Sequence, residues 1–342
     1  MKRILSTLTA ATLALTAGMA QAGGELFIYN WTEYTPPELI AKFEKETGIK
    51  VTIDTYDSNE TLLAKLQAGA TGYDLVVPSQ NFVPIFVSEG LIQKVNVSGM
   101  SNFKNIEERW RNPAWDPKQE YSAPWQWGTT SFSYNSENYS GKGESLKEFF
   151  EPNEEASGRV SAFQTPDEVV NLANIYLGLP FCSEDPREMK KVQELLVAQK
   201  EHIVAYNSET MSDMLASGEA VITNHWSGFS RLGRLTGAPI VYAYPKEGVI
   251  GWYDSLVVPT SANNVENARI FMNFMMDPVN MAMLTVNQGY GDSIIGSSAY
   301  YTDELKSAPE VNPPADLPVI FAETCSPKAQ TLIDKVWTKV MQ

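Results

Sequence analysis

The stretch Tyr29-Asn30-Trp31-Thr32-Glu33-Tyr34 is the part of the sequence from which the fold can be built outward. It follows a short apolar run, Leu26 to Ile28, which predicts a strand. It precedes Thr35-Pro36-Pro37-Glu38, in which Thr35 can cap a helix, the prolines fit its first positions and Glu38 completes a capping box. The sequence therefore predicts an aromatic and acidic turn between a strand and a helix.

The residues of this turn have the chemistry of a binding site for an organic ammonium ion. In open α/β sheets, ligands bind at the carboxyl ends of strands, which is where this turn lies. Trp31 and Tyr34 offer ring faces that attract a cation, and the Glu33 carboxylate can accept its N–H bonds. The alternative is that both rings only close the edge of the core and that Glu33 is solvated.

The first residues have the pattern of an export signal. Lys2-Arg3 is a basic start, Ile4 to Met19 is apolar, and Ala20-Gln21-Ala22 is an A-x-A cleavage site. The apolar run contains several serines and threonines, which makes it a poor membrane-spanning helix. We therefore expect a cleaved signal peptide over residues 1–22 and an exported, periplasmic protein that begins at about Gly23.

Charge and cysteine content restrict the partners and the compartment. A formal net charge of −15 argues against binding to nucleic acid or to an anionic membrane surface, because phosphate contacts need Lys and Arg. The two cysteines, Cys182 and Cys325, would lie in a compartment where disulfides persist. Their separation does not define a geometry, so their pairing stays open at this stage.

The first third of the chain predicts a parallel sheet with helices on both faces. After the opening strand the pattern alternates between apolar helical faces and strands, with irregular polar sequence from Asn96 to Lys118. The alternating stretch from Trp125 to Tyr134 predicts a strand that crosses between domains. The expected elements before it are a helix that ends at Gly48, a strand at 50–56, a helix at 59–67, a strand at 73–77 and a helix at 82–87.

The rest of the chain predicts a second α/β lobe and a return to the first. A strand from Gly251 to Val258 makes that return, and a turn is expected at Gln288-Gly289-Tyr290-Gly291. The methionines near residue 275 indicate core packing rather than a metal site. The expected helices are 166–177, 187–200, 210–216, 229–235, 265–275 and 328–341, and the expected strands are 159–163, 220–223 and 240–244.

Motifs for catalysis, metals and cofactors are absent from the sequence. His225 stands near Ser227, but no nucleophile elbow surrounds this pair. Neither metal-binding nor nucleotide-binding motifs occur, and the acids lack EF-hand spacing. We therefore expect no enzyme activity, no metal and no cofactor.

Aromatic and acidic residues instead recur at turns, where strands end or helices begin. Buried acids are costly unless they are paired, so several acids in one cleft would require cations. The positions are Trp31 with Glu33 and Tyr34, Glu168 at a helix start, Trp226, Trp252 with Asp254, and Tyr290.

Five sequence motifs, in order along the chain, resemble the periplasmic spermidine/putrescine-binding proteins of ABC importers. They are Phe27-Ile28-Tyr29-Asn30-Trp31-Thr32-Glu33-Tyr34, Asp74-Leu75-Val76-Val77-Pro78-Ser79, Tyr244-Pro245-Lys246-Glu247-Gly248, Trp252-Tyr253-Asp254-Ser255-Leu256 and Gln288-Gly289-Tyr290. The resemblance runs from about Glu25 to near the C-terminus and implies an α/β, two-lobe periplasmic-binding-protein type II fold. Each lobe would be a mainly parallel sheet flanked by helices, and two crossing strands would form a hinge. The implied division is 23–130 and 254–299 for lobe 1, and 131–253 and 300–342 for lobe 2.

The resemblance also implies a function and a set of site residues. The lobes would close over a polyamine of the putrescine or spermidine type, and the closed monomer would dock on a membrane permease. Thr32, Glu33 and Ser79 would contact one amine end of the ligand. Asp254 would meet an ammonium in the middle or at the far end. Glu168 would hold the other end. The aromatic walls would be Trp31, Tyr34, Trp226, Trp252 and Tyr290.

Three departures from the family pattern leave the ligand open. Thr165 stands where spermidine-preferring members have a second acid, Asn81 replaces an aromatic residue, and Cys325 stands near an expected glutamine. The lost acid favours a diamine such as putrescine, or a short ω-amino acid. Arg231 and Arg234 could meet a ligand carboxylate, although we expect them on a solvated helix face. A secreted enzyme acting on an amine is the alternative of a different class.

Overall fold

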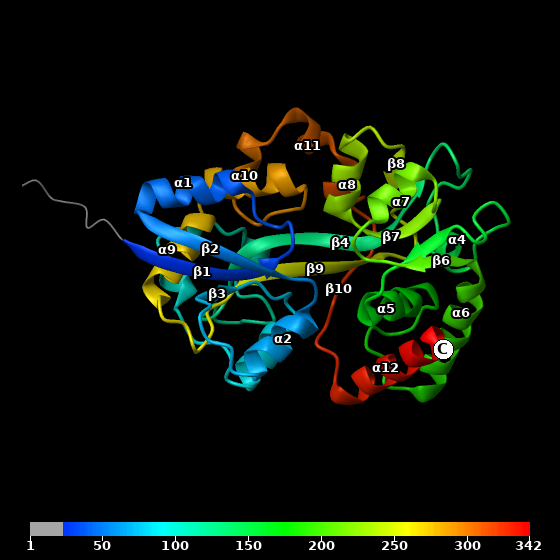
Figure 1. The fold of residues 1–342 in the computed structure, drawn as a ribbon, viewed down its shortest axis with the longest axis horizontal. Coiled ribbons are helices and arrows are strands. Elements are labelled where there is room, and N and C mark those ends of the chain that lie inside the picture. Colours follow the sequence, from blue (N-terminus) through cyan, green and yellow to red (C-terminus); the bar gives the residue numbers. More distant parts are fainter. Residues whose placement is uncertain (1–22) are drawn as a thin grey trace, which may run out of the picture.

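The computed structural model describes residues 23–342, which fold into two lobes side by side (Figure 1). The expected signal peptide lies outside the described residues. Each lobe has its own apolar core: Phe43 and Phe271 lie in the core of the first lobe, and Phe163 and Val336 in that of the second. A smaller cluster around Phe86 completes the first lobe. The expected two-lobe α/β fold is confirmed.

The first lobe is built on a parallel sheet of strand order β2-β1-β3. Strand β1 (Gly24–Trp31) lies between β2 (Ile49–Tyr56) and β3 (Leu75–Val76), and Ile28 pairs with residues of both neighbours. Because all three strands are parallel, their carboxyl ends meet at one edge of the sheet. The turn at Trp31 to Tyr34 lies at this edge.

Five helices belong to this lobe. Helix α1 ends at Gly48, whose φ of 74° is the left-handed conformation that favours glycine at a helix end. Helix α10 was not predicted from the sequence. Its start is nevertheless marked by Pro278 and by Asp277, whose side chain accepts hydrogen bonds from the first turn. The five are α1 (Pro37–Thr47), α2 (Asn59–Gln67), α3 (Val83–Ser88), α9 (Val265–Met275) and α10 (Pro278–Gln288).

The second sheet is mixed rather than mainly parallel. Its strand order is β10-β9-β4-β7-β5-β6, and β8 also pairs with β4. Strand β4 runs antiparallel to β7, β8 and β9, whereas the pairs β9–β10, β5–β6 and β5–β7 are parallel. The strands are β4 (Ala123–Asn135), β5 (Val160–Ala162), β6 (Ile203–Tyr206), β7 (Ile222–Trp226), β8 (Ile240–Tyr242), β9 (Val249–Leu256) and β10 (Val319–Phe321).

Strands β4 and β9 pass from one lobe to the other (Figure 1). In β4, Trp125 packs in the core of the first lobe and Phe132 in that of the second. In β9 the order is reversed, with Ile250 in the second core and Leu256 in the first. The two strands pair with each other along this length, so the lobes share one continuous β-ribbon.

Helices surround the second sheet, and several short helical turns complete the chain. The α-helices are α4 (Lys147–Phe150), α5 (Pro166–Tyr176), α6 (Pro186–Gln199), α7 (Met211–Ser217), α8 (Ser227–Leu235), α11 (Asp303–Ser307) and α12 (Pro327–Met341). The 3-10 turns are η1 (Val97–Gly99), η2 (Phe103–Asn105), η3 (Glu108–Trp110), η4 (Lys200–His202), η5 (Ser297–Tyr300) and η6 (Pro309–Val311). None of the helices in residues 23–342 has the length and apolarity needed to cross a membrane.

The segment after β10 makes further contacts between the lobes. The Gln80 side-chain amide donates to the Ala322 carbonyl at 3.0 Å, and the Thr324 hydroxyl donates to the Asn81 carbonyl at 2.6 Å. The next residue, Cys325, forms a disulfide with Cys182 in the loop after α5. The pairing left open by the sequence is therefore settled as a disulfide.

Two local expectations were wrong. The Thr35 hydroxyl does not cap α1; it accepts a hydrogen bond from the Asn30 side chain at 2.8 Å. Arg231 does not lie on a solvated face: it is 3% exposed and pairs with Glu304 at 2.5 Å. Arg234 pairs with Glu310 at 2.6 Å, so both arginines are held by acids from a distant segment.

Candidate functional site

Strand β1 ends in the turn at Trp31 to Tyr34, which has a buried side and an exposed tip. The Trp31 indole donates to the Val77 carbonyl at 2.8 Å, which fixes this ring against the end of β3. Thr32 and Glu33 form the exposed tip, and Glu33 has a φ of 55°, a conformation uncommon outside glycine. Tyr34 is 5% exposed, and its buried hydroxyl has no hydrogen-bond partner among the described residues.

Asp254 is a buried carboxylate on the crossing strand β9. It is 4% exposed, and the Ser79 hydroxyl donates to its Oδ1 at 2.7 Å. The pKa of Asp254 is raised to about 7, mainly by burial and in smaller part by the charge of Glu168, whereas Ser79 and the nearby Tyr34 favour the ionised form. The structure therefore places Ser79 and Asp254 together, joined also by an isolated β-bridge.

Glu168 is the matching acid of the second lobe. It lies in the first turn of α5, where a negative charge is favourable. Its Oε1 accepts hydrogen bonds from the Thr130 hydroxyl at 2.6 Å and from the Trp226 indole at 2.8 Å. Desolvation nonetheless raises the pKa of Glu168. The Thr165 hydroxyl donates to Glu168 Oε2 at 3.4 Å.

Aromatic rings lie beside both acids. Tyr290 packs edge-to-face on Trp252, with ring centroids 4.9 Å apart, and on Tyr34 at 5.7 Å. On the side of the second lobe, Trp226 stacks on Phe163 at 4.5 Å. The structure thus brings Tyr34, Trp252 and Tyr290 into one wall, and Trp226 forms another beside Glu168.

Two glycines make this ring packing possible. A Cβ added at Gly128 on β4 would lie 2.5 Å from the Trp252 ring and 2.9 Å from the Tyr290 ring. A Cβ at Gly228 would lie 2.5 Å from Tyr290. Each glycine closely follows a tryptophan in the sequence. The motifs Trp127-Gly128 and Trp226-Ser227-Gly228 were therefore the sequence features that could have indicated these close ring contacts.

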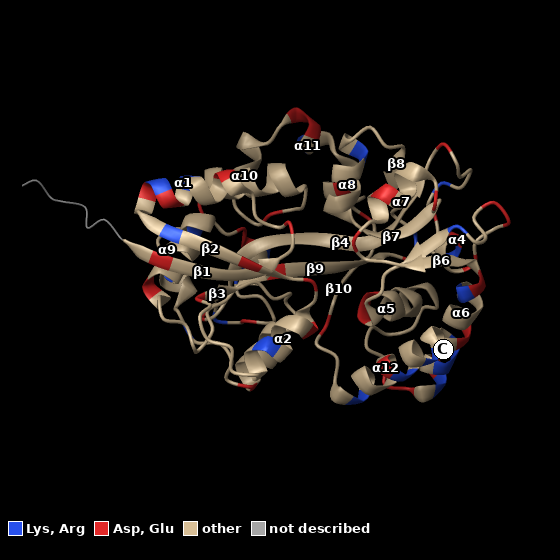
Figure 2. Cartoon of the chain, viewed as in Figure 1, with Lys and Arg blue, Asp and Glu red and all other residues tan. Residues whose placement is uncertain are grey.

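The start of α2 contributes to the same sheet edge. This helix was predicted from the sequence, but its first residues, Asn59 and Glu60, were not predicted to belong to the site. Asn59 bonds Ser79 through both ends of its side-chain amide. Glu60 faces the second lobe, and partial desolvation, followed by the charge of Asp167, raises its pKa to about 7. Figure 2 shows acidic positions at the facing ends of α2 and α5. The sequence feature that could have assigned Asn59 and Glu60 to the site was the position of α2 directly after the carboxyl end of strand β2.

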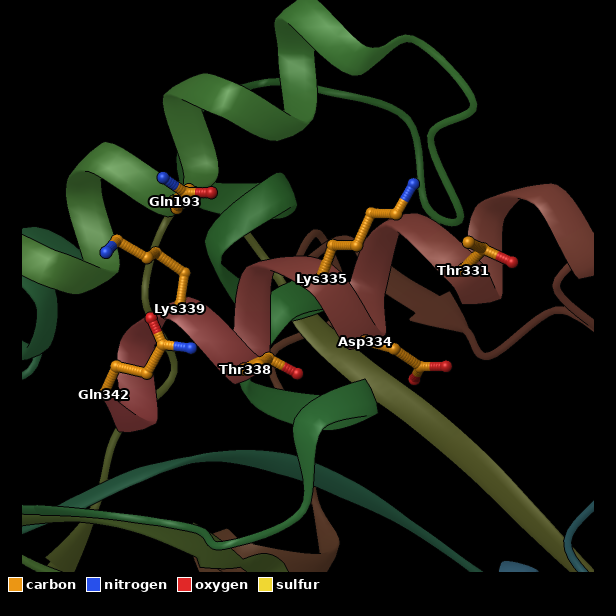
Figure 3. A pocket seen from close by; sticks show the side chains of 7 residues that line it. All are labelled: Gln193, Thr331, Asp334, Lys335, Thr338, Lys339 and Gln342. Carbon is orange, nitrogen blue, oxygen red and sulfur yellow. The ribbon is translucent and has the colours of Figure 1, made fainter.

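Other features of the structure do not form comparable sites. In residues 23–342, no group of His, Cys, Asp and Glu side chains has the geometry to hold a metal ion. His225 is buried in β7, where its ring contacts the hydroxyls of Ser133 and Ser212, and burial lowers its pKa to about 3. The hollow in Figure 3 lies on the outer face of α12 beside α6 and has no aromatic residue in its lining.

The family models and the sequence relatives agree with one another. Residues 38–313 match the model described as "Bacterial extracellular solute-binding protein". The chain is 34% identical to the "Spermidine/putrescine-binding periplasmic protein" of Escherichia coli K12 over 309 residues, which cover 90% of this chain and 88% of the relative. It is 32% identical to the "Putrescine-binding periplasmic protein SpuD" of Pseudomonas aeruginosa, with 99% of both chains covered.

A solved structure shows the same fold. The "Putative spermidine/putrescine ABC transporter from Listeria monocytogenes" superposes with a TM-score of 0.85 at 26% identity. The match covers 93% of this chain and 99% of that chain. The similarity therefore extends over both lobes.

Proposed function

The chain belongs to the family of bacterial extracellular solute-binding proteins, and from this premise we propose that it binds a small polyamine between its lobes. It acts outside the cytoplasm, in the periplasm, and delivers the ligand to the permease of an ABC importer. The names of its relatives support this class of ligand, since the two compared above are both named for putrescine binding. We propose that the lobes divide at 130/131, 253/254 and 299/300, the boundaries expected from the sequence.

One observation carries the proposal: each group of aromatic rings has beside it an acid without a cation, namely the buried Asp254 and the half-buried Glu168. Within residues 23–342, neither Asp254 nor Glu168 forms an ion pair with Lys or Arg. A desolvated carboxylate is costly until an opposite charge joins it. A diammonium ligand supplies one charge to each acid, and its methylene chain fits between ring faces.

The individual residues then take the following roles. Asp254, held by Ser79, binds one ammonium, and Glu168 binds the other. Thr32 and Glu33, at the exposed tip of the β1 turn, meet the ligand as the lobes close. The rings that enclose the ligand chain are Trp31, Tyr34, Trp226, Trp252 and Tyr290.

The geometry favours a diamine over the two alternative ligands. Thr165 adds no charge beside Glu168, so this position offers no acid to a third ammonium. A ligand carboxylate, as in an ω-amino acid, would need a free cation, but Arg231 and Arg234 already pair with Glu304 and Glu310. Putrescine is therefore the preferred ligand.

A calorimetric screen tests this proposal directly. Putrescine, spermidine, agmatine and a short ω-amino acid are titrated into the purified mature chain, and thermal unfolding is recorded in parallel. A ligand in hundredfold excess over its dissociation constant adds about 2.7 kcal/mol to the free energy of unfolding. The proposal fails if none of the amines binds while a neutral or anionic solute does.

The competing hypothesis, a secreted enzyme acting on amines, needs a separate measurement. The two ring nitrogens of His225 hydrogen-bond to the hydroxyls of Ser133 and Ser212 rather than to Ser227. Incubation with the same amines, followed by mass spectrometry, should return each amine unchanged. A new product would contradict the binding-only function.

A further inference from the structure

Asn59, the first residue of α2, is joined to the proposed site by a chain of hydrogen bonds. Its Oδ1 accepts from the backbone N–H of Ser79 at 3.0 Å, and its Nδ2 donates to Ser79 Oγ at 3.1 Å. Ser79 Oγ in turn donates to Asp254 Oδ1 at 2.7 Å. Asn59 therefore contacts Ser79 twice and reaches Asp254 only through it.

The direction of each bond follows from the chemistry of the groups. The backbone N–H of Ser79 can only donate, so the atom of Asn59 that faces it must be the amide oxygen. The Asn59 NH₂ group must then face Ser79 Oγ, which can only accept from it. The single hydroxyl hydrogen of Ser79 is thereby left for Asp254.

This hydrogen matters because of what surrounds Asp254. The charged and titratable groups that face it are Tyr34 after β1, Tyr56 on β2, Tyr290 after α10 and Glu168 on α5. None of them is a cation, and Glu168 opposes ionisation. The Ser79 hydroxyl is therefore a principal contact that stabilises the Asp254 anion.

We propose that Asn59 is a positioning residue of the ligand cleft, which orients the Ser79 hydroxyl toward the Asp254 carboxylate that meets an ammonium ion. The inference rests on the proposed function for its ligand, but the hydrogen-bond relay itself exists without one. A purely structural role for Asn59 at the start of α2 is the alternative. The cap of that helix is already supplied by Ser58, whose Oγ accepts from the Thr61 N–H at 3.2 Å.

The test compares Asn59→Ala, Ser79→Ala and the double variant by calorimetry with putrescine over a range of pH. Each single change should weaken binding about tenfold, the size expected for a lost hydrogen bond to a charged group. Because both act through one hydroxyl, the double variant should bind about as weakly as Ser79→Ala alone. Losses that multiply in the double variant, or an unchanged affinity of Asn59→Ala, would overturn the inference.

The pH profile separates positioning from a structural defect. Binding requires the Asp254 anion, so affinity falls as pH drops through the pKa of this group. Asn59→Ala should move that midpoint to higher pH, since the Ser79 hydroxyl is no longer held toward the anion. Ser58→Ala removes the helix cap instead, so it should lower the melting temperature and leave the midpoint where it is. A midpoint that shifts equally in both variants would assign Asn59 to helix stability.

A measurement on the unaltered protein covers the case in which Asn59→Ala does not fold. The side-chain amide of Asn59, followed by ¹⁵N NMR without ligand, should titrate with Asp254 and cease to do so in Asp254→Asn. An amide signal that does not respond to pH would contradict the relay. If the relay titrates but no amine binds the wild-type protein, the proposed function fails and the positioning of Asp254 by Asn59 stands.

Discussion

At the scale of single residues, we propose that ligand binding depends most on Asp254. Asp254→Asn keeps the shape of the side chain and removes its charge, so the ammonium group proposed to bind Asp254 loses its partner. Putrescine binding should weaken by about 2 to 5 kcal/mol, the range for truncating one partner of a buried charge pair. The ligand-free fold should be retained, because the uncompensated buried acid is gone. Isothermal calorimetry and a thermal melt measure the two effects.

Glu33→Gln provides the matched control for this change. Glu33 is exposed at the tip of the β1 turn, whereas Asp254 is 4% exposed. Solvent screens an exposed charge, so the Glu33 change should cost less than the Asp254 change. The reverse order of the two losses would place the ammonium ion away from Asp254.

At the scale of elements, the crossing strand β4 supports the aromatic wall through Gly128. In Gly128→Ala the new methyl group would lie 2.5 Å from the Trp252 ring, so the rings must move. Overpacking of this kind costs about 1 to 3 kcal/mol of stability, and the displaced rings should also weaken putrescine binding. Gly233→Ala on α8 crowds Ser212 and Ile240 instead and should lower stability with affinity retained. Equal affinities for both variants would remove Trp252 and Tyr290 from the site.

Elements were predicted well where the pattern is local. The predicted limits of α2 and α9 agree with the structure, because apolar residues at helical spacing lie between clear end signals. Helix α10 was missed because its buried face includes the polar residues Asn280, Thr285 and Gln288, while apolar residues such as Val279 lie on the more exposed side. Its sequence therefore gives little periodic contrast. The mixed character of the second sheet was missed because a strand's apolar pattern does not give its direction.

The site was predictable only in part, because local sequence patterns do not show contacts between distant residues. Its aromatic and acidic members stand at turns that sequence patterns reveal, and the structure gathers Tyr34, Ser79, Asp254 and Tyr290. The roles of Arg231 and Asn59 depend on partners far along the chain. Arg231 pairs with Glu304, and Asn59 acts on Ser79 across 20 positions. A single sequence carries no record of such contacts.

At the scale of the whole molecule, the facing acids of the two lobes make stability and binding depend on pH. The folded pKa of Asp254, about 7, lies above its ordinary value of 3.8, and Glu60 also rises to about 7. Between these values the folded protein binds more protons than the unfolded chain, so the ligand-free protein should lose stability as pH rises from about 4 to about 7. Putrescine affinity should rise over the same interval, because bound ammonium ions require ionised acids.

Urea unfolding without ligand and calorimetry with putrescine, both measured over this interval, check the two slopes. Asp254→Asn should flatten the pH dependence of both stability and affinity, and Glu60→Gln should flatten that of stability. A ligand-free stability that increases toward pH 7 would contradict the assignment of these acids as uncompensated in the open cleft.

The most direct test of the central claim is a crystal structure of the protein with putrescine. The account predicts one ligand nitrogen within hydrogen-bond distance, about 3 Å, of the Asp254 carboxylate and the other at the same distance from Glu168. The methylene chain should lie between the rings of Trp252 and Trp226. A ligand bound outside the space between the lobes, or a closed cleft in which neither acid touches an ammonium nitrogen, would contradict it.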